Sequence, residues 1–342
     1  MKFQVSRTLL SLFLNATRAS KISSSDMFSN TVCIIVNSEG INFVFRDAMS
    51  YIKFGQKHEY QGASASSAVN VDQLLAACST SSDPVMRMNI DSDGRTHVKI
   101  YGAWVPFEMF FPDIEFYASP IKGLTPVMRV STFFLETLYK AAKFVGVMGT
   151  IYMYKDRVIA PRSQDFFFTR GKFPRMNISR EDARKLCGLF ENSRQKILVY
   201  STDDSYVFYN GIFMCGIMKR SLEDTYHLNL SVQAGKGVPI ERERAIKILR
   251  FLGESAQVRI VVGDSVHLAF DPPGVEGKSV QFLISQEETQ GRIPSYATLP
   301  AAMLREAISV MRDGVSVSVV NGAAFVKRED SMVVLYGTGS SQ

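Results

Sequence analysis

The chain has no long apolar run, few cysteines and few histidines, and each shortage argues against a class of protein. No apolar stretch approaches the ~18 residues that a membrane-spanning helix needs. The four cysteines, Cys33, Cys78, Cys187 and Cys215, contain no Cys-x-x-Cys pair, and Cys33 and Cys215 sit within apolar runs. We therefore expect free thiols in a reducing compartment rather than a disulfide framework.

Groups that carry catalysis or bind metals and nucleotides are equally scarce. The four histidines, His58, His97, His227 and His267, are far apart in the sequence, and no His-Glu-x-x-His motif is present. The segment Ala234-Gly235-Lys236-Gly237 resembles a phosphate-binding loop but lacks its first glycine and the Ser or Thr after the lysine. No nucleophile, base and orienting group are found together. We expect no catalytic residue, no metal site and no cofactor.

In place of these features the chain has an ordinary globular composition and a small positive charge. Hydrophobic residues make up 46% and charged residues 21% of its 342 residues, a length typical of two or three domains. Its 39 Lys and Arg against 33 Asp and Glu give a net charge of +6, which favours polyanionic partners such as nucleic acid. The apolar run at 9–14 is followed at once by Asn15 and Arg18, so we interpret it as part of an amphipathic helix rather than a signal peptide.

One sequence unit, an amphipathic helix followed by two or three strands, recurs six times. The helices are predicted to start near Ser6, Val71, Ser131, Ser179, Pro239 and Pro300. Serine at the start is a good N-cap, and proline suits the first helical turn. All but the fifth helix follow a short extended segment. Spacings of 48 to 65 residues between these starts indicate an internal repeat.

A hairpin turn is predicted after each helix. The strongest signals are Asp93-Gly94 and Asn321-Gly322, because alternating apolar and polar residues flank two-residue turns of this type. The other turns are predicted at Glu39-Gly40, Lys155-Asp156, Asp203-Asp204 and Gly263-Asp264. Five of the six lie 21 to 24 residues after the helix start, and the first lies 33 residues after it because residues 21–30 form a polar insertion.

Each repeat has one helix and a small antiparallel sheet with one apolar face, so it must pack against a neighbour to bury that face. We expect two repeats in each domain. The boundaries fall in a segment that carries Pro120 and Gly123, and at residues 220–225. The prediction is an α+β protein of three domains, at residues 1–120, 121–222 and 223–342.

Three domains, each a doubled helix-plus-hairpin unit, resemble the bacterial type of DNA polymerase sliding clamp over nearly the whole chain. The resemblance implies the DNA-clamp fold, with sheets outside and helices lining a central hole. It implies a non-enzymatic processivity factor that encircles double-stranded DNA as a head-to-tail ring homodimer and tethers the DNA polymerase, after a clamp loader has placed it. The place of action is then the cytoplasm of a bacterial cell or a phage-infected host, with no membrane partner. A net charge of +6 departs from the acidic charge typical of bacterial clamps and fits a phage-encoded or divergent member.

The helix faces provide an independent check on this resemblance. In the first helix, Leu10 and Phe13 lie on an apolar stripe opposite Arg7 and Arg18. Basic residues recur on the free side of four other helices, and the second helix has none. The predicted DNA-facing residues are Arg7, Arg18, Lys140, Lys143, Arg184, Lys185, Arg244, Lys247, Arg305 and Arg312. Such side chains bind phosphates without reading the base sequence, as sliding requires.

The resemblance also implies two protein interfaces. Client proteins of the family insert a short hydrophobic peptide between the second and third domains, and the matching residues are Arg162, Ser163, Gln164, Phe166, Val333, Leu335 and Tyr336. The ring dimer joins the outer strand of the first domain to the third domain. For this contact we predict the residues Trp104, Phe107, Phe251 and Leu252.

Three alternatives remain open. A monomeric viral-type processivity factor shares the doubled domain but grips DNA on one basic face, and the molecular mass in solution separates it from a ring. A clamp-like platform serves transcription or repair factors in place of a polymerase. An enzyme of an unrelated repeat fold is the third, and the sequence offers it no set of catalytic residues.

Overall fold

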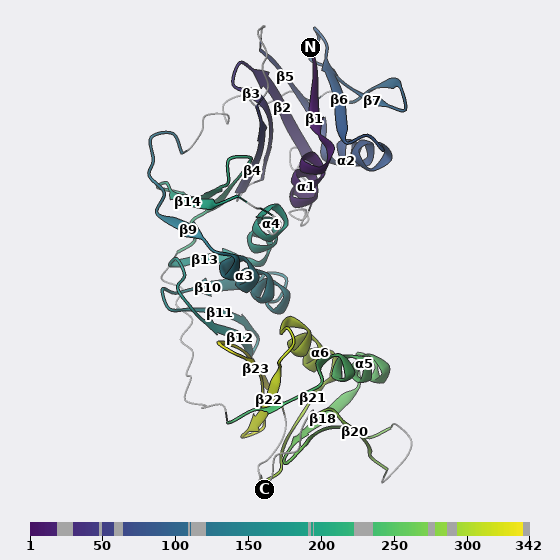
Figure 1. Cartoon of the computed structure of the whole chain (residues 1–342), viewed down its shortest axis with the longest axis vertical. Coiled ribbons are helices and arrows are strands. Elements are labelled where there is room, and N and C mark those ends of the chain that lie inside the picture. The colour runs from purple at the N-terminus through teal and green to yellow at the C-terminus, as the bar shows by residue number, and fades with distance from the viewer. Residues whose placement is uncertain are drawn as a thin grey trace. The chain divides into compact units, whose positions relative to one another are not determined.

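The computed structural model describes residues 1–18, 30–47, 50–57, 64–108, 110, 121–190, 193, 195–221, 235–272, 278–285 and 293–337. Its helices are α1 (Arg7–Arg18), α2 (Val71–Thr80), α3 (Thr132–Phe144), α4 (Arg180–Phe190), α5 (Arg242–Leu252) and α6 (Ala301–Val310), which Figure 1 shows along the chain. Most of the predicted polar insertion at 21–30 and most of the predicted domain boundaries lie outside the described residues.

In the part of the chain that the structure describes, the strands fall into six groups of four, one group around each helix. The first two groups are β1 (Lys2–Ser6), β2 (Thr31–Asn37), β3 (Gly40–Arg46) and β4 (Ser50–Gln56), then β5 (Ala65–Asn70), β6 (Val85–Ile90), β7 (Thr96–Ile100) and β8 (Ala103–Pro106). The next two are β9 (Met128–Val130), β10 (Thr150–Met153), β11 (Arg157–Arg162) and β12 (Asp165–Arg170), then β13 (Met176–Ser179), β14 (Ile197–Ser201), β15 (Ser205–Tyr209) and β16 (Phe213–Met218). The last two are β17 (Val238–Pro239), β18 (Gln257–Val262), β19 (Val266–Phe270) and β20 (Val280–Leu283), then β21 (Ser295–Pro300), β22 (Ser316–Val320), β23 (Ala323–Arg328) and β24 (Ser331–Tyr336).

Each repeat is therefore a strand, a helix and three further strands, which confirms the predicted sixfold repeat and the α+β class. All six predicted turns fall between the second and third strands of a repeat. Every helix begins within three residues of its predicted start. The Ser6 and Ser131 hydroxyls accept hydrogen bonds from the backbone N–H groups of Leu9 and Phe134, as N-caps should.

Two local expectations were wrong. The fifth helix does follow an extended segment, since Pro239 ends the two-residue strand β17 rather than opening a helical turn. Pro300 occupies the N-cap of α6, directly before its first helical residue. The cap of α2 was missed: the Asn70 side chain accepts hydrogen bonds from the backbone N–H groups of Asp72 and Gln73. Proline fixes φ and has no backbone N–H to donate, and both a strand end and a helix cap accommodate this.

Neighbouring repeats exchange their first strands. β1 pairs with β6 of the second repeat, and β5 pairs in return with β2 of the first. The same exchange joins β9 to β14 and β13 to β10, and joins β17 to β22 and β21 to β18. Each repeat thus completes a sheet of its neighbour, so the repeats are interlocked in pairs.

The chain divides into two compact units. The first is Met1–Leu138 with Glu181–Arg220, and the second is Tyr139–Arg180 with Ser221–Gln342. Each compact unit holds one eight-stranded sheet, in the order β5-β2-β3-β4-β16-β15-β14-β9 and β13-β10-β11-β12-β24-β23-β22-β17 respectively. Each also holds one four-stranded sheet, β1-β6-β7-β8 in the first and β20-β19-β18-β21 in the second. The eight-stranded sheets arise where two half-sheets meet edge to edge, at β4·β16, which we call seam 1, and at β12·β24, which we call seam 2.

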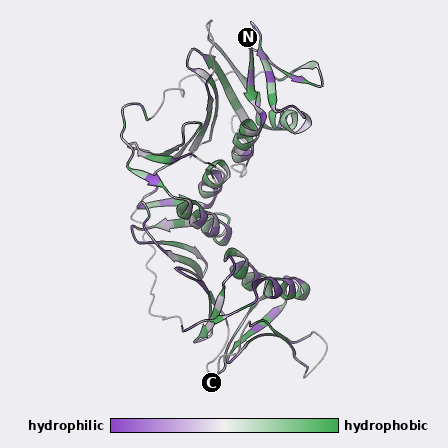
Figure 2. Ribbon diagram, in the orientation of Figure 1, coloured by the Kyte–Doolittle hydropathy of each residue, from purple (hydrophilic) through white to green (hydrophobic). Residues whose placement is uncertain are grey.

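In the first compact unit, the apolar side of α1 packs on the eight-stranded sheet. Phe13 is fully buried and contacts the rings of Phe43 and Phe54, with ring centroids 6.3 and 6.2 Å away. Phe54 in turn lies 5.5 Å from Phe213 across seam 1. Figure 2 shows both apolar and polar residues on the helices, as expected for helices that cover a sheet with one side only.

Candidate nucleic-acid and partner interfaces

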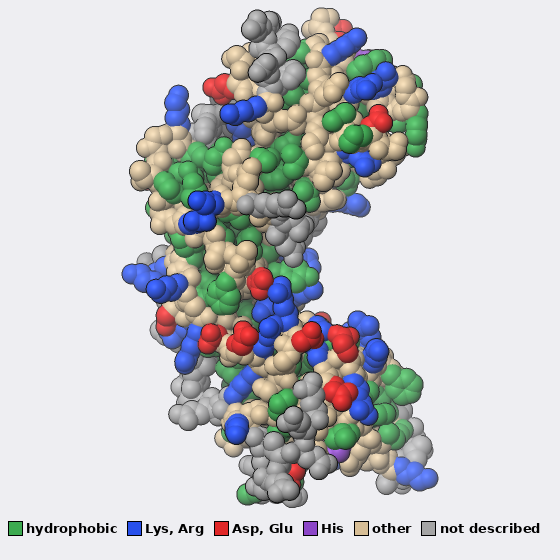
Figure 3. Space-filling model, viewed as in Figure 1, with side chains coloured by type: hydrophobic (Ala, Val, Ile, Leu, Met, Phe, Trp, Pro, Cys, Tyr) green, Lys and Arg blue, Asp and Glu red, His purple; other side chains and the backbone are tan. Residues whose placement is uncertain are grey.

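Nine of the ten basic residues predicted to face DNA lie on or beside helices with their side chains at least partly exposed. The exposed ones are Arg18, Lys143, Arg184, Arg244, Lys247 and Arg312, and the half-buried ones are Arg7, Lys140 and Arg305. In Figure 3, Lys and Arg side chains gather with acidic side chains over the region of α5 and α6. The surface of these helices is therefore mixed in charge.

Some of these residues occupy equivalent positions in different repeats. Arg18 is the twelfth residue of α1, and Lys143 is the twelfth residue of α3. Arg184 is the fifth residue of α4, and Arg305 is the fifth of α6. Because the repeats share one fold, equivalent positions present their side chains on the same side of each helix. A cation at such a position is thus a recurring feature of the surface.

Several of these cations have weak local partners. Arg305 lies 2.8 Å from Glu254 and Arg244 lies 3.7 Å from Glu241, and pairs as exposed as these contribute little to stability. The Lys143 ammonium lies 4.3 Å from the centre of the Tyr139 ring. Among the described residues, no carboxylate forms an ion pair with Arg184 or Lys247. These side chains are available to an anionic partner.

Lys185 does not face DNA, which corrects the prediction. Its side chain is almost fully buried in the first compact unit, 2.7 Å from the Asp47 carboxylate and 3.4 Å from Asp182. It also donates a hydrogen bond to the Ser50 hydroxyl. Burial alone lowers the pKa of Lys185, but the negative charges of Asp182 and Asp47 raise it above its ordinary value, so this ammonium stays charged. It is a structural cation within seam 1.

The predicted peptide pocket centres on the turn between β11 and β12 in the second compact unit. Ser163 adopts a positive φ of 56° within this turn. The Gln164 side chain donates to the Tyr336 carbonyl, while the Asp165 carboxylate accepts a hydrogen bond from the Tyr336 backbone N–H at 2.8 Å. Arg162 forms an ion pair with Glu306 of α6. Burial raises the pKa of Asp165 despite this hydrogen bond and the nearby charge of Arg162.

The structure brings only part of the predicted pocket to the surface. Ser163 and Gln164 are exposed and Tyr336 is half-buried, whereas Phe166, Val333 and Leu335 are 4%, 0% and 0% exposed. Phe166 pairs with Val334 across seam 2, so it shares a sheet face with Val334, and Val333 and Leu335 point to the other face. One peptide therefore cannot contact all three buried side chains. The accessible part of the site is the turn and the end of β24.

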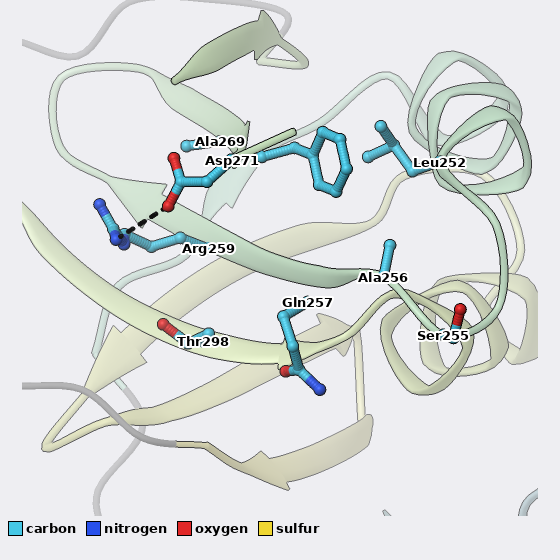
Figure 4. Close-up of a pocket in the computed structure, with 9 residues that line it drawn as sticks. Leu252, Ser255, Ala256, Gln257, Arg259, Ala269, Asp271 and Thr298 are labelled. Carbon is cyan, nitrogen blue, oxygen red and sulfur yellow. Dashed lines mark ion pairs between the residues drawn. The ribbon is translucent and has the colours of Figure 1, made fainter. Parts of the chain in front are cut away.

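The residues predicted for the dimer contact lie in or just after the outer strand β8 and at the end of helix α5. All four residues of β8 are exposed, with Trp104 at 39%, but Phe107 is buried just after the strand. Phe251 at the end of α5 is 81% exposed. Beside it Leu252 lines a pocket of about 380 Å³ whose other walls come from the loop after α5 and from neighbouring strands, as Figure 4 shows. In that view Arg259 reaches toward Asp271, 3.7 Å away.

Sequence reasoning missed a wide groove in the first compact unit. Its volume is about 720 Å³, and Leu9, Val85, Ile121, Tyr209 and Ile212 supply apolar surface. Lys53 lines the same groove, and burial lowers its pKa, while the charge of Glu39 opposes this shift. These residues come from distant parts of the chain, so no local pattern marks the groove.

None of the helices that the structure describes combines the length and hydrophobicity needed to cross a bilayer.

Comparison with known proteins places the fold. No protein-family model matches the chain, and no curated protein sequence matches it. Among solved structures, the beta subunit of DNA polymerase from Streptococcus pyogenes is similar at a TM-score of 0.78 and 12% identity, over 100% of both chains. The DNA polymerase sliding clamp of Bacillus subtilis is similar at a TM-score of 0.77 and 11% identity, over 99% of both chains.

A third similar structure contains a bound peptide. The Helicobacter pylori beta clamp, solved with a DNA ligase peptide, has a TM-score of 0.73 and 12% identity, over 99% of this chain and 100% of that one. The likeness in each case runs the length of the chain while the sequences have diverged almost completely. The chain therefore has the bacterial sliding-clamp fold, which confirms the fold predicted from its repeats.

Proposed function

We propose that this protein is a DNA sliding clamp, a non-enzymatic processivity factor that encircles duplex DNA as a head-to-tail ring of two copies. The observation that carries the proposal is the arrangement of sheet edges. Seam 1 joins the first repeat to the fourth, and seam 2 joins the third to the sixth. The first and third repeats are thus each joined through their last strand to the repeat three places further along the chain.

The same rule leaves one odd repeat without a partner. The fifth repeat ends in β20, and three places further would be the second repeat of another copy, which ends in β8. Within the described residues, β20 and β8 are the outer strands of their four-stranded sheets. An unpaired edge invites another strand. Pairing β20 of one copy with β8 of the next would give a third eight-stranded sheet, and two copies would close the ring.

Side chains on β8 and at the end of α5 suit a contact between copies. Trp104 and Phe251 are large, apolar and exposed, and Leu252 lines the pocket beside Phe251. Aromatic anchors that fill a pocket contribute most of the affinity in many interfaces. Phe107 is already buried within its own copy and would support β8 rather than contact the partner directly.

The helix surfaces suit DNA held without sequence preference. Arg18, Lys143, Arg184 and Arg305 recur at equivalent helix positions, so a ring would present them repeatedly along its inner wall. Exposed cations exchange phosphate contacts readily, which permits sliding. The expected binding is salt-dependent and blind to base sequence.

The DNA polymerase and the clamp loader are the proposed protein partners, acting in the cytoplasm of a bacterial or phage-infected cell. Their docking site would be the β11–β12 turn and the end of β24, where Ser163, Gln164 and Tyr336 are accessible. A short peptide that buries one or two anchor side chains gains about 1.5–3 kcal/mol from each, so exchange between partners would be quick.

Retention on circular DNA tests the proposal. A clamp loaded onto nicked circular DNA by its loader should survive a high-salt wash and run off when the circle is cut, because a closed ring leaves only over an end. An open protein that depends on phosphate contacts would be lost from both forms as salt rises. Equal salt sensitivity on circular and linear DNA would show a monomer that grips DNA on one face.

A further inference from the structure

The two seams have the same backbone register. In seam 1, Phe54, the fifth residue of β4, pairs with Phe213, the first residue of β16. In seam 2, Thr169, the fifth residue of β12, pairs with Ser331, the first residue of β24. Backbone hydrogen bonds depend on register and not on side-chain identity. Backbone hydrogen bonds alone therefore do not distinguish the correct partner of a strand from the equivalent strand of the other seam.

An ion pair beside each seam has opposite polarity in the two cases. Lys185 is the sixth residue of α4 and binds Asp47, which follows β3 in the turn before β4. Glu306 is the sixth residue of α6 and binds Arg162, the last residue of β11 in the turn before β12. The helix thus supplies the cation in seam 1 and the anion in seam 2. The turn supplies the opposite charge each time.

Side-chain size differs at a second equivalent position. Tyr51, the second residue of β4, pairs with Gly216, and a Cβ added to this glycine would fall inside the Tyr51 ring. Phe166, the second residue of β12, pairs instead with Val334. Tyr51 placed opposite Val334 would clash, and Phe166 placed opposite Gly216 would leave a void.

Polarity differs at a third position, where the fifth residue of one strand meets the first of the other. Phe54 and Phe213 form an apolar aromatic pair with ring centroids 5.5 Å apart. Thr169 and Ser331 are both buried, and their hydroxyl oxygens are 3.0 Å apart in a hydrogen bond. If the strands exchanged partners, each buried hydroxyl of Thr169 and Ser331 would lie opposite a phenyl ring. Each hydroxyl would then lose its hydrogen bond.

We infer that the two seams are chemically keyed, so that each edge strand accepts its own partner and rejects the equivalent strand of the other seam. Charge, size and polarity are each complementary in the native pairing and conflicting in the exchanged one. An exchanged pairing would bring Lys185 against Arg162 and Glu306 against Asp47. Repeat proteins are prone to such misassembly between domains or copies, and specificity against it requires repulsive elements as well as attractive ones. This inference stands independently of the proposed function.

Reversing the polarity of seam 2 tests the keying in the full chain. The double variant Arg162→Asp with Glu306→Lys keeps an ion pair in seam 2 but gives it the polarity of seam 1, so exchanged pairings become attractive. The neutral variant Arg162→Gln with Glu306→Gln removes the pair without creating a wrong attraction. Both positions are partly exposed, so both variants should keep an unfolding free energy within about 1 kcal/mol of wild type in urea.

The measurement is the fraction of native protein recovered after refolding from urea over a range of micromolar concentrations. Size-exclusion chromatography compares each refolded sample with the same variant that was never unfolded. The reversed variant should recover at least about threefold less native protein than the neutral variant, with the remainder as soluble oligomers or aggregate. Equal recovery of native protein from the two variants, whether high or low, overturns the inference.

A second variant keeps the test decisive if the reversed protein folds poorly on expression. Glu306→Lys in the Arg162→Gln background carries the same attraction toward Asp47 and no like charge within seam 2. Its refolding should also fall below that of the neutral variant, and recovery equal to the neutral variant counts against the keying.

Discussion

Seam 1 and seam 2 join equivalent strands through different side chains, whereas β8 and β20 are outer strands among the described residues. In seam 1 the ion pair is buried, with the Lys185 side chain 3% exposed, whereas in seam 2 the Arg162 and Glu306 side chains are 37% and 43% exposed. A buried cation that loses its partner is costly, and an exposed pair is cheap to remove. Two strand pairings with the same backbone register can therefore differ in how much an adjacent ion pair stabilises them.

The largest expected effect is on seam 1. Lys185→Met removes the buried ammonium that binds the Asp47 and Asp182 carboxylates, so the unfolding free energy should fall by about 3–5 kcal/mol in urea denaturation. The folded-state pKa of Lys185 is raised, so its contribution is complete below the ordinary lysine pKa of about 10.4 and is lost only as pH rises through the higher folded value. The difference between variant and wild type should therefore persist throughout the neutral range.

The control for this change is the adjacent residue. Arg184→Met removes an exposed cation from the same helix and should change the unfolding free energy by less than about 0.5 kcal/mol. If both variants lose the same stability, the loss is a property of α4 as a whole, and the distinction between the seams disappears.

The proposed contact between copies should show the next largest effect. Phe251→Ala with Leu252→Ala removes the apolar surface proposed to meet the edge of a second copy, and should weaken self-association by about 2–4 kcal/mol. Sedimentation should show a shift toward the 38.2 kDa monomer. Met148→Ala is the matched control, since Met148 is 86% exposed and lies far along the chain from either edge. An unchanged mass for the double variant excludes this contact.

A buried carboxylate in seam 2 is expected to have a smaller, pH-dependent effect. Burial raises the folded pKa of Asp165 above its unfolded value, so the unfolded chain ionises first as pH rises, and stability falls between the two pKa values. Asp165→Asn keeps an oxygen acceptor for the Tyr336 N–H and removes the charge. This variant should be more stable than wild type at pH 7 and equal to it at pH below the unfolded pKa.

Asp165→Ala is the companion variant, because it removes the acceptor as well as the charge. Its loss of the Tyr336 hydrogen bond should cost about 1 kcal/mol relative to Asp165→Asn in urea denaturation at neutral pH. Identical stability of the two variants would mean that the hydrogen bond contributes nothing to seam 2.

The smallest expected effect is on the exposed ion pair of seam 2. Arg162→Gln with Glu306→Gln should lower the unfolding free energy by no more than about 1 kcal/mol, and added salt should reduce the difference further. A loss as large as that of Lys185→Met would make the two seams equivalent in strength, contrary to their burial.

Local structure was predictable from the sequence because local physical rules determine it. Asp93-Gly94 and Asn321-Gly322 mark hairpins because alternating residues flank them, and serine before an apolar stripe marks a helix start. The two-residue strand β17 was missed because so short a segment carries no periodicity. Exposure of Arg18, Lys143 and Lys247 followed from helical spacing alone.

The candidate sites were only partly predictable. The turn at Ser163 and Gln164 is where it was expected, but the face on which each neighbouring side chain lies depends on the pairing of β12 with β24. The alternation of side chains along a strand divides its residues between two faces. It does not specify which strand Phe166 or Val333 pairs with.

The sequence by itself determined six repeats, their turns, their amphipathic helices and the exposure of most of the basic residues on those helices. Tertiary structure alone decided which strands are exchanged, which edges form seams and which remain open. Lys185 shows the reason most clearly, since its charged partner Asp47 is 138 residues away in the chain. Helical spacing placed this lysine beside Arg184 on a solvated face, but desolvation and ion pairing depend on what lies nearby in space, and only the folded chain specifies that.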